Sequence, residues 1–271
     1  MHERCRHRSC LAKWIAISCA HGMYSRPPER VVIKQVLSTG DSERAFNTLR
    51  KLALHQVSRW VLVGGLAVEF HCLRARNTPM IRRLNDIDFV ASAFDCIPKT
   101  LARDFLFRHV HPFDPPGKTM MQLIDAETSL RVDLFRACGR VMRRTISVDL
   151  PSGPLQVISV EDALAHAARL LLDLDASVRV PQKHAADYLR LTELVKPSDV
   201  ETAWRDHRKP IHPVTFRETK TLINRLVATR RNLLTNPEYS TNAAEICPRC
   251  VRTTPFQLAD PKVVLSLLGY C

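Results

Sequence analysis

Residues 61–67 read Val-Leu-Val-Gly-Gly-Leu-Ala, and this stretch decides which fold the rest of the chain has to fit. Three apolar residues, two of them β-branched, are typical of a short buried strand. The pair Gly64 and Gly65 permits a sharp turn, and residues 66–73 have helical character. We therefore expect a strand, a glycine turn and a helix, with the helix N-terminus placed where a phosphate group can approach the backbone closely.

Two further stretches carry regularly spaced carboxylates. Residues 86–90 read Asp-Ile-Asp-Phe-Val, so that Asp86 and Asp88 share one face of a strand, about 6–7 Å apart along it. Residues 131–135 read Arg-Val-Asp-Leu-Phe and repeat the alternation around Asp133, beside an arginine. If the two strands are neighbours, three carboxylates converge, and they repel one another unless a cation lies between them. That cation is either a divalent ion, for which oxygen ligands favour magnesium or manganese, or the charged group of a close ion pair.

The rest of the chain divides into two parts that differ in the periodicity of their hydrophobic residues. Residues 41–159 alternate strand-like and helix-like pieces, whereas residues 160–236 have the period of helices. In the first part we expect helices from Asp41 or Ser42 to Gln56 and at 97–105, and strands at 120–124, 130–135, 145–150 and 155–158. In the second part we expect a helix capped by Ser159, a helix from Pro181 that stops at Pro197, and a helix at 213–235.

These elements predict an α+β fold in which a mixed β-sheet is flanked by helices and followed by a mostly helical C-terminal region. Three regions are expected: a loosely attached basic N-terminal extension (1–30), a catalytic domain (31–159) and a helical C-terminal domain (160–271). The extension starts basic and continues into a short apolar run. A weak signal peptide or a misassigned start, with Met23 rather than Met1 as the first residue, both explain this.

Composition limits the class of protein and its partners. The 271 residues are 45% hydrophobic and 25% charged, which favours a folded chain over a disordered one. Nine cysteines are too sparse for a secreted disulfide framework, and no stretch approaches the length of a membrane span, so we expect a cytoplasmic protein without a membrane partner. Cys247 and Cys250 form one Cys-x-x-Cys pair, which is either a zinc ligand pair or a simple thiol-bearing tail. The formal net charge of +13 points to a polyanionic partner or to a merely basic protein.

The order of the glycine turn and the carboxylates resembles the nucleotidyltransferase superfamily of the polymerase-beta type. The residues that carry the resemblance are Gly64 and Gly65 after a hydrophobic strand, the Asp86-Ile87-Asp88 pair, and Asp133 on a later strand. Arg83, three residues before Asp86, is similar to the form found in the branch of abortive-infection type toxins and related antibiotic-modifying enzymes. The resemblance covers residues 45–195.

The resemblance implies a nucleotidyltransferase fold and a two-metal reaction that uses a nucleoside triphosphate (NTP) and Mg²⁺ or Mn²⁺. Asp86, Asp88 and Asp133 are then the catalytic and metal-binding residues. Gly64, Gly65, Arg83 and Lys183 bind the nucleotide, although Lys183 is equally well read as a solvated charge. Two departures concern phosphate binding. Gly65 replaces a serine that many members have, and His166 and Arg169 lie where members often carry a lysine.

Three functions fit these residues. The first is nucleotide transfer to RNA, for instance to a transfer RNA end, in the manner of a toxin that an antitoxin protein would hold in check; the positive charge favours it. The second is transfer to an antibiotic or another small molecule, whose usually cationic acceptors favour an acidic cleft. The third is a non-catalytic basic interaction module on the same fold, which the three intact aspartates disfavour.

Overall fold

The computed structural model describes residues 36–57, 59–75, 83–93, 97–109, 120–150, 153–173, 182–229 and 257–258. The expected N-terminal extension and the Cys247/Cys250 pair lie outside these ranges. Within them, no helix combines the length and the apolar content that crossing a membrane requires.

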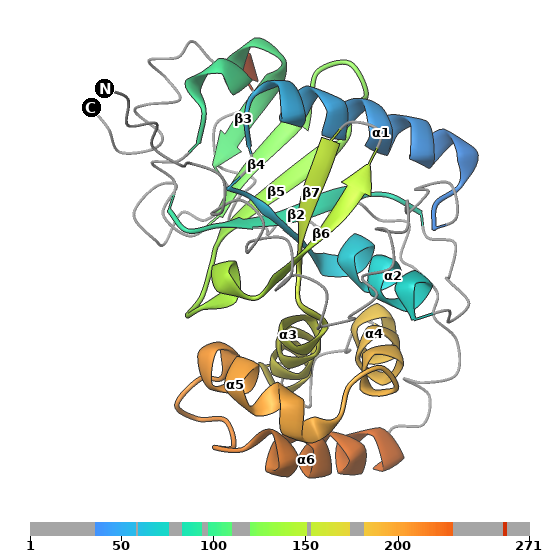
Figure 1. Ribbon diagram of the computed structural model, residues 1–271, viewed down its shortest axis with the longest axis vertical. Helices are drawn as coiled ribbons and strands as arrows, with labels where there is room; N and C mark the ends of the chain where they lie inside the picture. The colour runs from blue at the N-terminus through green and yellow to red at the C-terminus, as the bar shows by residue number, and fades with distance from the viewer. Residues whose placement is uncertain are drawn as a thin grey trace, which may run out of the picture.

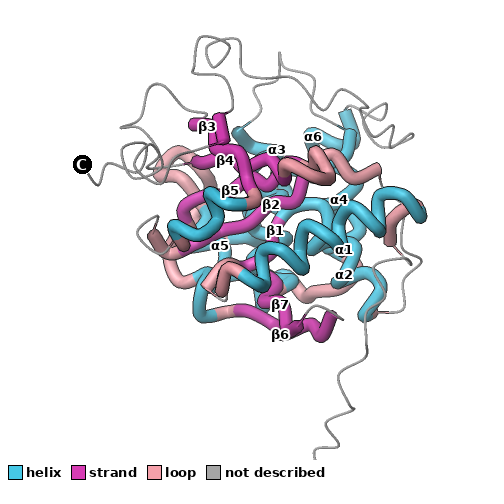
Figure 2. Tube along the Cα trace, turned by 90° about the horizontal axis from the view of Figure 1, so that it is seen from above, coloured by secondary structure: helices cyan, strands magenta, loops and turns pink. Residues whose placement is uncertain are grey.

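A mixed eight-stranded sheet forms the centre of the molecule, in the order β6-β7-β1-β2-β5-β4-β3-β8. Figure 2 shows most of these strands in succession from one edge to the other. β1 is parallel to β7 and antiparallel to β2, while β2 is parallel to β5. The strands are β1 (Val61–Val63), β2 (Asp86–Ala91), β3 (Phe105–His109), β4 (Met120–Asp125), β5 (Arg131–Arg136), β6 (Thr145–Leu150), β7 (Gly153–Ile158) and β8 (Gln257–Leu258).

Helices cover the sheet unequally. In Figure 1, α1 crosses one side of the sheet, α2 lies on the other side, and α3 to α6 continue away from it. α3 packs on α4, α5 and α6, and α2 contacts both α3 and α4. This arrangement confirms the expected α+β class with a mixed sheet followed by helices. The helices are α1 (Thr39–Leu54), α2 (Gly64–Arg74), α3 (Val160–Asp173), α4 (Gln182–Thr192), α5 (Pro197–His207) and α6 (Phe216–Thr229), with 3₁₀ helices η3 (Lys99–Arg103) and η4 (Val141–Arg143).

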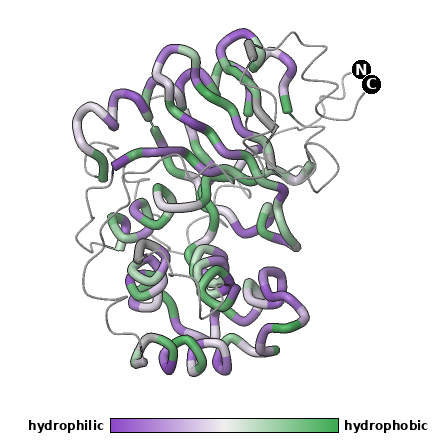
Figure 3. The backbone as a smooth tube through the Cα atoms, turned by 180° about the vertical axis from the view of Figure 1, so that it is seen from behind, coloured by the Kyte–Doolittle hydropathy of each residue, from purple (hydrophilic) through white to green (hydrophobic). Residues whose placement is uncertain are grey.

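The position of α2 between the sheet and the helical layer explains its composition. Every residue from Leu66 to Cys72 is buried, because β1 and β2 lie on one side of α2 and α3 and α4 on the other. Burial on all sides removes the need for an amphipathic pattern. The outermost helix differs: hydrophobic and hydrophilic segments alternate along α6 (Figure 3), where Phe216 and Ile223 are buried and Arg217 is exposed.

Several boundaries differ from those predicted, and three of the differences have a local cause. α1 begins after Ser38, whose hydroxyl accepts the backbone N–H of Asp41, so the cap lies earlier than Asp41 or Ser42. The stretch 97–105 contains only the short helix η3, and the chain enters β3 at Phe105. Pro197 is where α5 starts, because a proline that terminates one helix also suits the first turn of the next.

Candidate active site

The register of β2 and β5 brings the three aspartates together. The strands run parallel, with Asp88 opposite Asp133 and Asp86 opposite Arg131. One carboxylate oxygen from each of Asp86, Asp88 and Asp133 lies within 4.8 Å of the others. Among the residues that the structure describes, no other group of three acidic, histidine or cysteine side chains is gathered in this way. The two strands are therefore neighbours, which is the condition under which the sequence predicts that the three carboxylates converge.

Alternation along the two strands aims these side chains at one face. Burial alternates through β2, where Ile87 and Phe89 are buried in the core and Asp86 and Asp88 are only partly buried. Asp133 lies deepest of the three aspartates, with 4% of its surface exposed. The cluster is therefore buried at Asp133 and more open to solvent at Asp86 and Asp88.

Arg131 supplies positive charge inside the cluster. Its Nη2 donates to Asp86 Oδ2, and its Nε lies 3.2 Å from Asp133 Oδ1. Two regularities cause this arrangement: Arg131 shares a strand face with Asp133 two residues away, and the β2–β5 register places it opposite Asp86. The first could be seen in the sequence, whereas the second depends on strand pairing.

The glycine turn lies directly against the carboxylates. Val63, the last residue of β1, pairs with Asp88, and the backbone then enters α2 at Gly64 with φ +68°. A Cβ atom at Gly64 would lie 2.1 Å from Asp88 Oδ2 and 2.9 Å from Asp88 Cβ. Both the left-handed backbone and the close approach therefore require glycine at this position. Gly65 follows in the first turn of α2, so the helix N-terminus and its amides lie beside the aspartates.

Buried polar contacts fix the helix that carries this turn. Glu69 of α2 is completely buried and accepts two hydrogen bonds from the Arg190 guanidinium of α4, at 2.6 and 2.7 Å. His71 Nε2 donates to the carbonyl of Ile158 at the end of β7, at 2.8 Å. Burial lowers the pKa of His71 despite that hydrogen bond, so the ring is neutral at pH 7. These contacts tie α2 to the sheet and to α4.

The donor set of the cluster fits a small divalent cation. All three ligands are carboxylates, and Mg²⁺ prefers oxygen ligands at about 2.0–2.1 Å, so that oxygens on opposite sides of an ion are about 4.2 Å apart. The oxygens of Asp86, Asp88 and Asp133, all within 4.8 Å of one another, need little movement to reach that spacing. Arg131 would have to give up part of its contact with Asp86 or Asp133 in the process.

Two of the predicted nucleotide-binding residues, Arg83 and Lys183, belong to other segments of the chain. Arg83 is exposed in the segment that leads into β2, and its neighbour Leu84 donates its backbone N–H to Asp41 of α1. Lys183 belongs to the first turn of α4, and its side chain is outside the described part of the structure. The geometry brings Gly64 and the three aspartates together, and it leaves the roles of Arg83 and Lys183 as predictions.

No family model and no curated protein matches the sequence. Three solved structures are similar to parts of it. An antigenic nucleotidyltransferase-like protein from Paracoccidioides brasiliensis shows 17% identity and a TM-score of 0.43, over 73% of this chain and 92% of that chain. The antibiotic-resistance factor ANT(2'')-Ia shows 12% identity and a TM-score of 0.44, over 70% and 99% of the two chains. The Megavirus polyadenylate synthase shows 12% identity and a TM-score of 0.40, over 59% of this chain and 34% of that chain. Similarity at this level says nothing about residue roles, which depend on the side chains of the site itself.

Proposed function

We propose that this chain is a metal-dependent nucleotidyltransferase that moves a nucleoside monophosphate from an NTP to an acceptor hydroxyl. The observation that carries the proposal is the convergence of Asp86, Asp88 and Asp133 within 4.8 Å, beside the helix N-terminus at Gly64. A carboxylate cluster suits divalent cations, and a glycine-led helix N-terminus suits phosphate. The order of these residues along the chain also resembles the polymerase-beta type superfamily, and we extend the proposal to its abortive-infection toxin branch because of Arg83.

In this proposal each residue has a defined task. Asp86 and Asp88 would hold two Mg²⁺ or Mn²⁺ ions, and Asp133 would help to hold one of them. When bound, the ions polarise the acceptor hydroxyl and offset the charge of the phosphates. The acceptor oxygen attacks the α-phosphorus, the bond to the β-phosphate oxygen breaks, and pyrophosphate leaves. Asp133, the most buried of the three carboxylates, takes the proton of the acceptor hydroxyl.

The remaining residues of the site bind the triphosphate. The amides of Gly64 and Gly65 at the N-terminus of α2 donate to phosphate oxygens, because a helix N-terminus attracts negative charge. Arg83 reaches the triphosphate from the segment before β2, and Lys183 does so from α4. With cations bound to the aspartates, Arg131 would be available to the phosphates, since its guanidinium suits either kind of oxygen.

We propose RNA as the acceptor class. The formal net charge of +13 favours a polyanionic acceptor, and a transfer RNA end held by a toxin-like enzyme, with an antitoxin protein as partner, is its most specific form. A small-molecule acceptor such as an aminoglycoside is the alternative. It gains support from the excess of carboxylates at the cluster, which suits a cationic acceptor. The third candidate function is a non-catalytic basic interaction module on the same fold.

A transfer assay separates these functions. The purified chain is incubated with α-labelled NTPs and Mg²⁺, and with either total RNA or a panel of aminoglycosides. Label in RNA supports the proposal, and label in the small molecule supports the alternative. Absence of label from every acceptor, in protein shown to bind Mn²⁺ and NTP, would leave the non-catalytic module and overturn the enzymatic assignment.

A further inference from the structure

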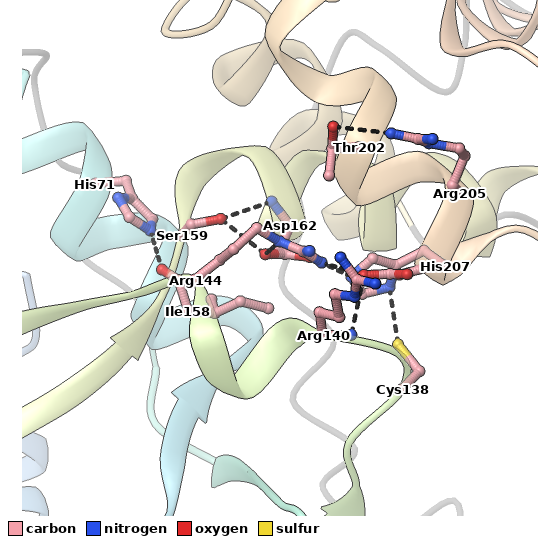
Figure 4. A network of polar contacts seen from close by, with 11 residues as sticks. His71, Cys138, Arg140, Arg144, Ile158, Ser159, Asp162, Thr202, Arg205 and His207 are labelled. Carbon is pink, nitrogen blue, oxygen red and sulfur yellow. Dashed lines mark hydrogen bonds and ion pairs between the residues drawn. The ribbon is translucent and has the colours of Figure 1, made fainter.

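A second group of reactive side chains lies beyond the end of β5. Cys138 Sγ is 3.4 Å from His207 Nδ1, and His207 Nε2 is 3.0 Å from Asp162 Oδ1. Figure 4 shows Cys138, His207 and Asp162 following one another in this order. Cys138 lies two residues after β5, His207 ends α5, and Asp162 lies in the first turn of α3. Three elements distant in sequence thus build a thiol–imidazole–carboxylate series.

The carboxylate end of the series is fixed and charged. Asp162 is completely buried, and it accepts two hydrogen bonds from Arg144 at 2.7 and 2.8 Å and one from the Ser159 hydroxyl at 2.9 Å. Burial alone would raise the pKa of Asp162, but the contacts with Arg144, His207 and Ser159 outweigh it and lower the pKa to about 2. An ionised Asp162 accepts the Nε2–H of His207, which leaves Nδ1 directed at the thiol.

The imidazole is suited to take a proton from that thiol. Burial opposes protonation of His207, yet the hydrogen bonds with Asp162 and Cys138 prevail and raise its pKa. The titratable and charged groups around the pair are Asp162, which is bonded to His207, and His166, whose ring lies edge-on to that of His207. Behind them, Arg144 bridges Asp162 and Asp206. His166 is neutral at pH 7, because burial, followed by the charges of Arg169, His207 and His184, lowers its pKa to about 3. His207 is therefore the group in this cluster that can exchange a proton with Cys138.

Access distinguishes Cys138 from the other described cysteine. Cys72 is completely buried in α2, whereas Cys138 is partly exposed in the turn between β5 and η4. A nucleophilic thiol needs a base and access for the reagent, and Cys138 combines the neighbouring His207 with partial exposure.

We propose that Cys138, His207 and Asp162 form a second reactive site, in which Cys138 is an activated nucleophile that hydroperoxides modify. The proton of Cys138 passes from Sγ to His207 Nδ1, and Asp162 stabilises the resulting imidazolium. The thiolate attacks one oxygen of the hydroperoxide and the O–O bond breaks. The sulfur is oxidised to a sulfenic acid, and the peroxide is reduced to water or an alcohol that takes up the proton.

Timed alkylation of the whole reduced chain tests this site. Iodoacetamide labelling followed by peptide mass spectrometry gives the rate at Cys138. An ordinary thiol is only about 1% thiolate at pH 6.5. We therefore expect Cys138 to react about tenfold faster at that pH than the same residue in the chain unfolded by urea. We also expect its rate to change little between about pH 6 and 8, where an ordinary thiol gains about tenfold per pH unit.

Two matched variants locate the cause. His207→Gln keeps an amide that can donate to Asp162 but removes the base, and it should slow Cys138 about tenfold. Arg205→Gln removes a cation from the same helix, where Arg205 is exposed and bonded to Thr202, and should change the rate less than about twofold. With hydrogen peroxide and dimedone, the adduct should form at Cys138 in the wild type and fall with His207→Gln.

Two results would overturn the proposal. One is a wild-type rate that follows the pH profile of the urea-unfolded chain. The other is a folded His207→Gln variant that reacts as fast as the wild type. Because the first result needs no variant, the test decides even if His207→Gln does not fold.

Discussion

Two carboxylate clusters of this molecule differ in how their charge is balanced. At the junction of α3 and α5, Asp162 and Asp206 share the Arg144 guanidinium, Asp162 also accepts from His207, and Asp206 accepts the backbone N–H of Arg140. At the other cluster, Asp86, Asp88 and Asp133 converge within 4.8 Å, with Arg131 against two of them. Counted by formal charge and without Cys138, the junction is neutral when His207 is protonated, whereas at the other cluster three carboxylates and one guanidinium leave two negative charges in excess.

The balance of charge thus distinguishes aspartates that hold elements together from aspartates that are suited to bind a cation. Buried carboxylates that are paired with cationic side chains and hydrogen-bond donors hold elements together. Removing one partner of such an ion pair destabilises the fold. Carboxylates gathered beyond their local cations repel one another, which has a free-energy cost that a bound divalent ion removes. We therefore propose cation binding for the Asp86 cluster, whereas the Asp162 cluster holds α3 and α5 together and orients His207 toward Cys138. Each prediction below tests one side of that contrast.

The largest effect is expected for Asp88→Asn. The amide keeps the shape of the side chain but loses the charge that the cations need, so nucleotide transfer should fall at least about 1,000-fold, or about 4 kcal/mol of activation free energy. Labelled-NTP incorporation and circular dichroism together check this. Asp149→Asn on the outer strand β6 is the control and should keep full transfer. A folded Asp88→Asn variant that still transfers would refute the assignment.

Gly64→Ala tests the contact between the glycine turn and the cluster. The new Cβ would overlap Asp88 Oδ2 at 2.1 Å with the backbone at φ +68°, so we expect a loss of about 2 kcal/mol of unfolding free energy and more than about tenfold in transfer. Gly40→Ala in α1 is the matched control. No heavy atom lies within 4 Å of its added Cβ, and it should stabilise the chain by about 0.5–1 kcal/mol. Equal effects in urea denaturation would contradict the proposed tight turn.

Acid titration probes the balanced cluster. The folded pKa of Asp162 is about 2, below its ordinary value of 3.8, so its stabilising contribution is present above about pH 4 and is lost as the pH falls toward 2. The loss should amount to about 2 kcal/mol of unfolding free energy. Urea denaturation at a series of pH values measures it, and Asp162→Asn, although less stable overall, should be flatter in this window. Parallel curves for the two proteins would show that Asp162 is not the group responsible.

The smallest effect is expected for Arg131→Gln. Removing the guanidinium frees Asp86 and Asp133 for a cation, so Mn²⁺ affinity should rise about three- to fivefold, or about 1 kcal/mol for this partly exposed pair. Isothermal titration calorimetry measures this. Arg136→Gln, exposed at the end of the same strand, controls for the change in overall charge and should leave the affinity within about twofold. A weaker Mn²⁺ affinity in Arg131→Gln would mean that Arg131 supports the cation site rather than competes for it.

Local patterns allowed much of the site to be predicted from the sequence. Alternation in β2 placed Asp86 and Asp88 on one face, because the period of a strand is fixed by its backbone. The strand–glycine–helix succession at Gly64 was predicted from the β-branched apolar run and the glycine pair that follows it. Ser159 was predicted to cap α3, and its hydroxyl indeed accepts the backbone N–H of Asp162.

What the sequence could not supply depends on contacts between distant segments. The bond between Arg131 and Asp86 requires the register of β2 and β5, and the approach of His207 to Cys138 requires the packing of α5 on α3. Pro197 was interpreted only as a terminator, although proline also suits the start of the helix that follows. At 97–105 the helical propensity produced only the short helix η3, because from Phe105 onward the chain pairs with β4 as β3.

Mn²⁺ binding measured by electron paramagnetic resonance tests the contrast between the two clusters most directly. The wild-type chain should bind Mn²⁺, Asp88→Asn should weaken that binding at least about tenfold, and His207→Gln at the balanced cluster should bind as the wild type does. Mn²⁺ affinity that is unchanged by Asp88→Asn, or lost with His207→Gln, would contradict the assignment of Asp86, Asp88 and Asp133 as the cation site.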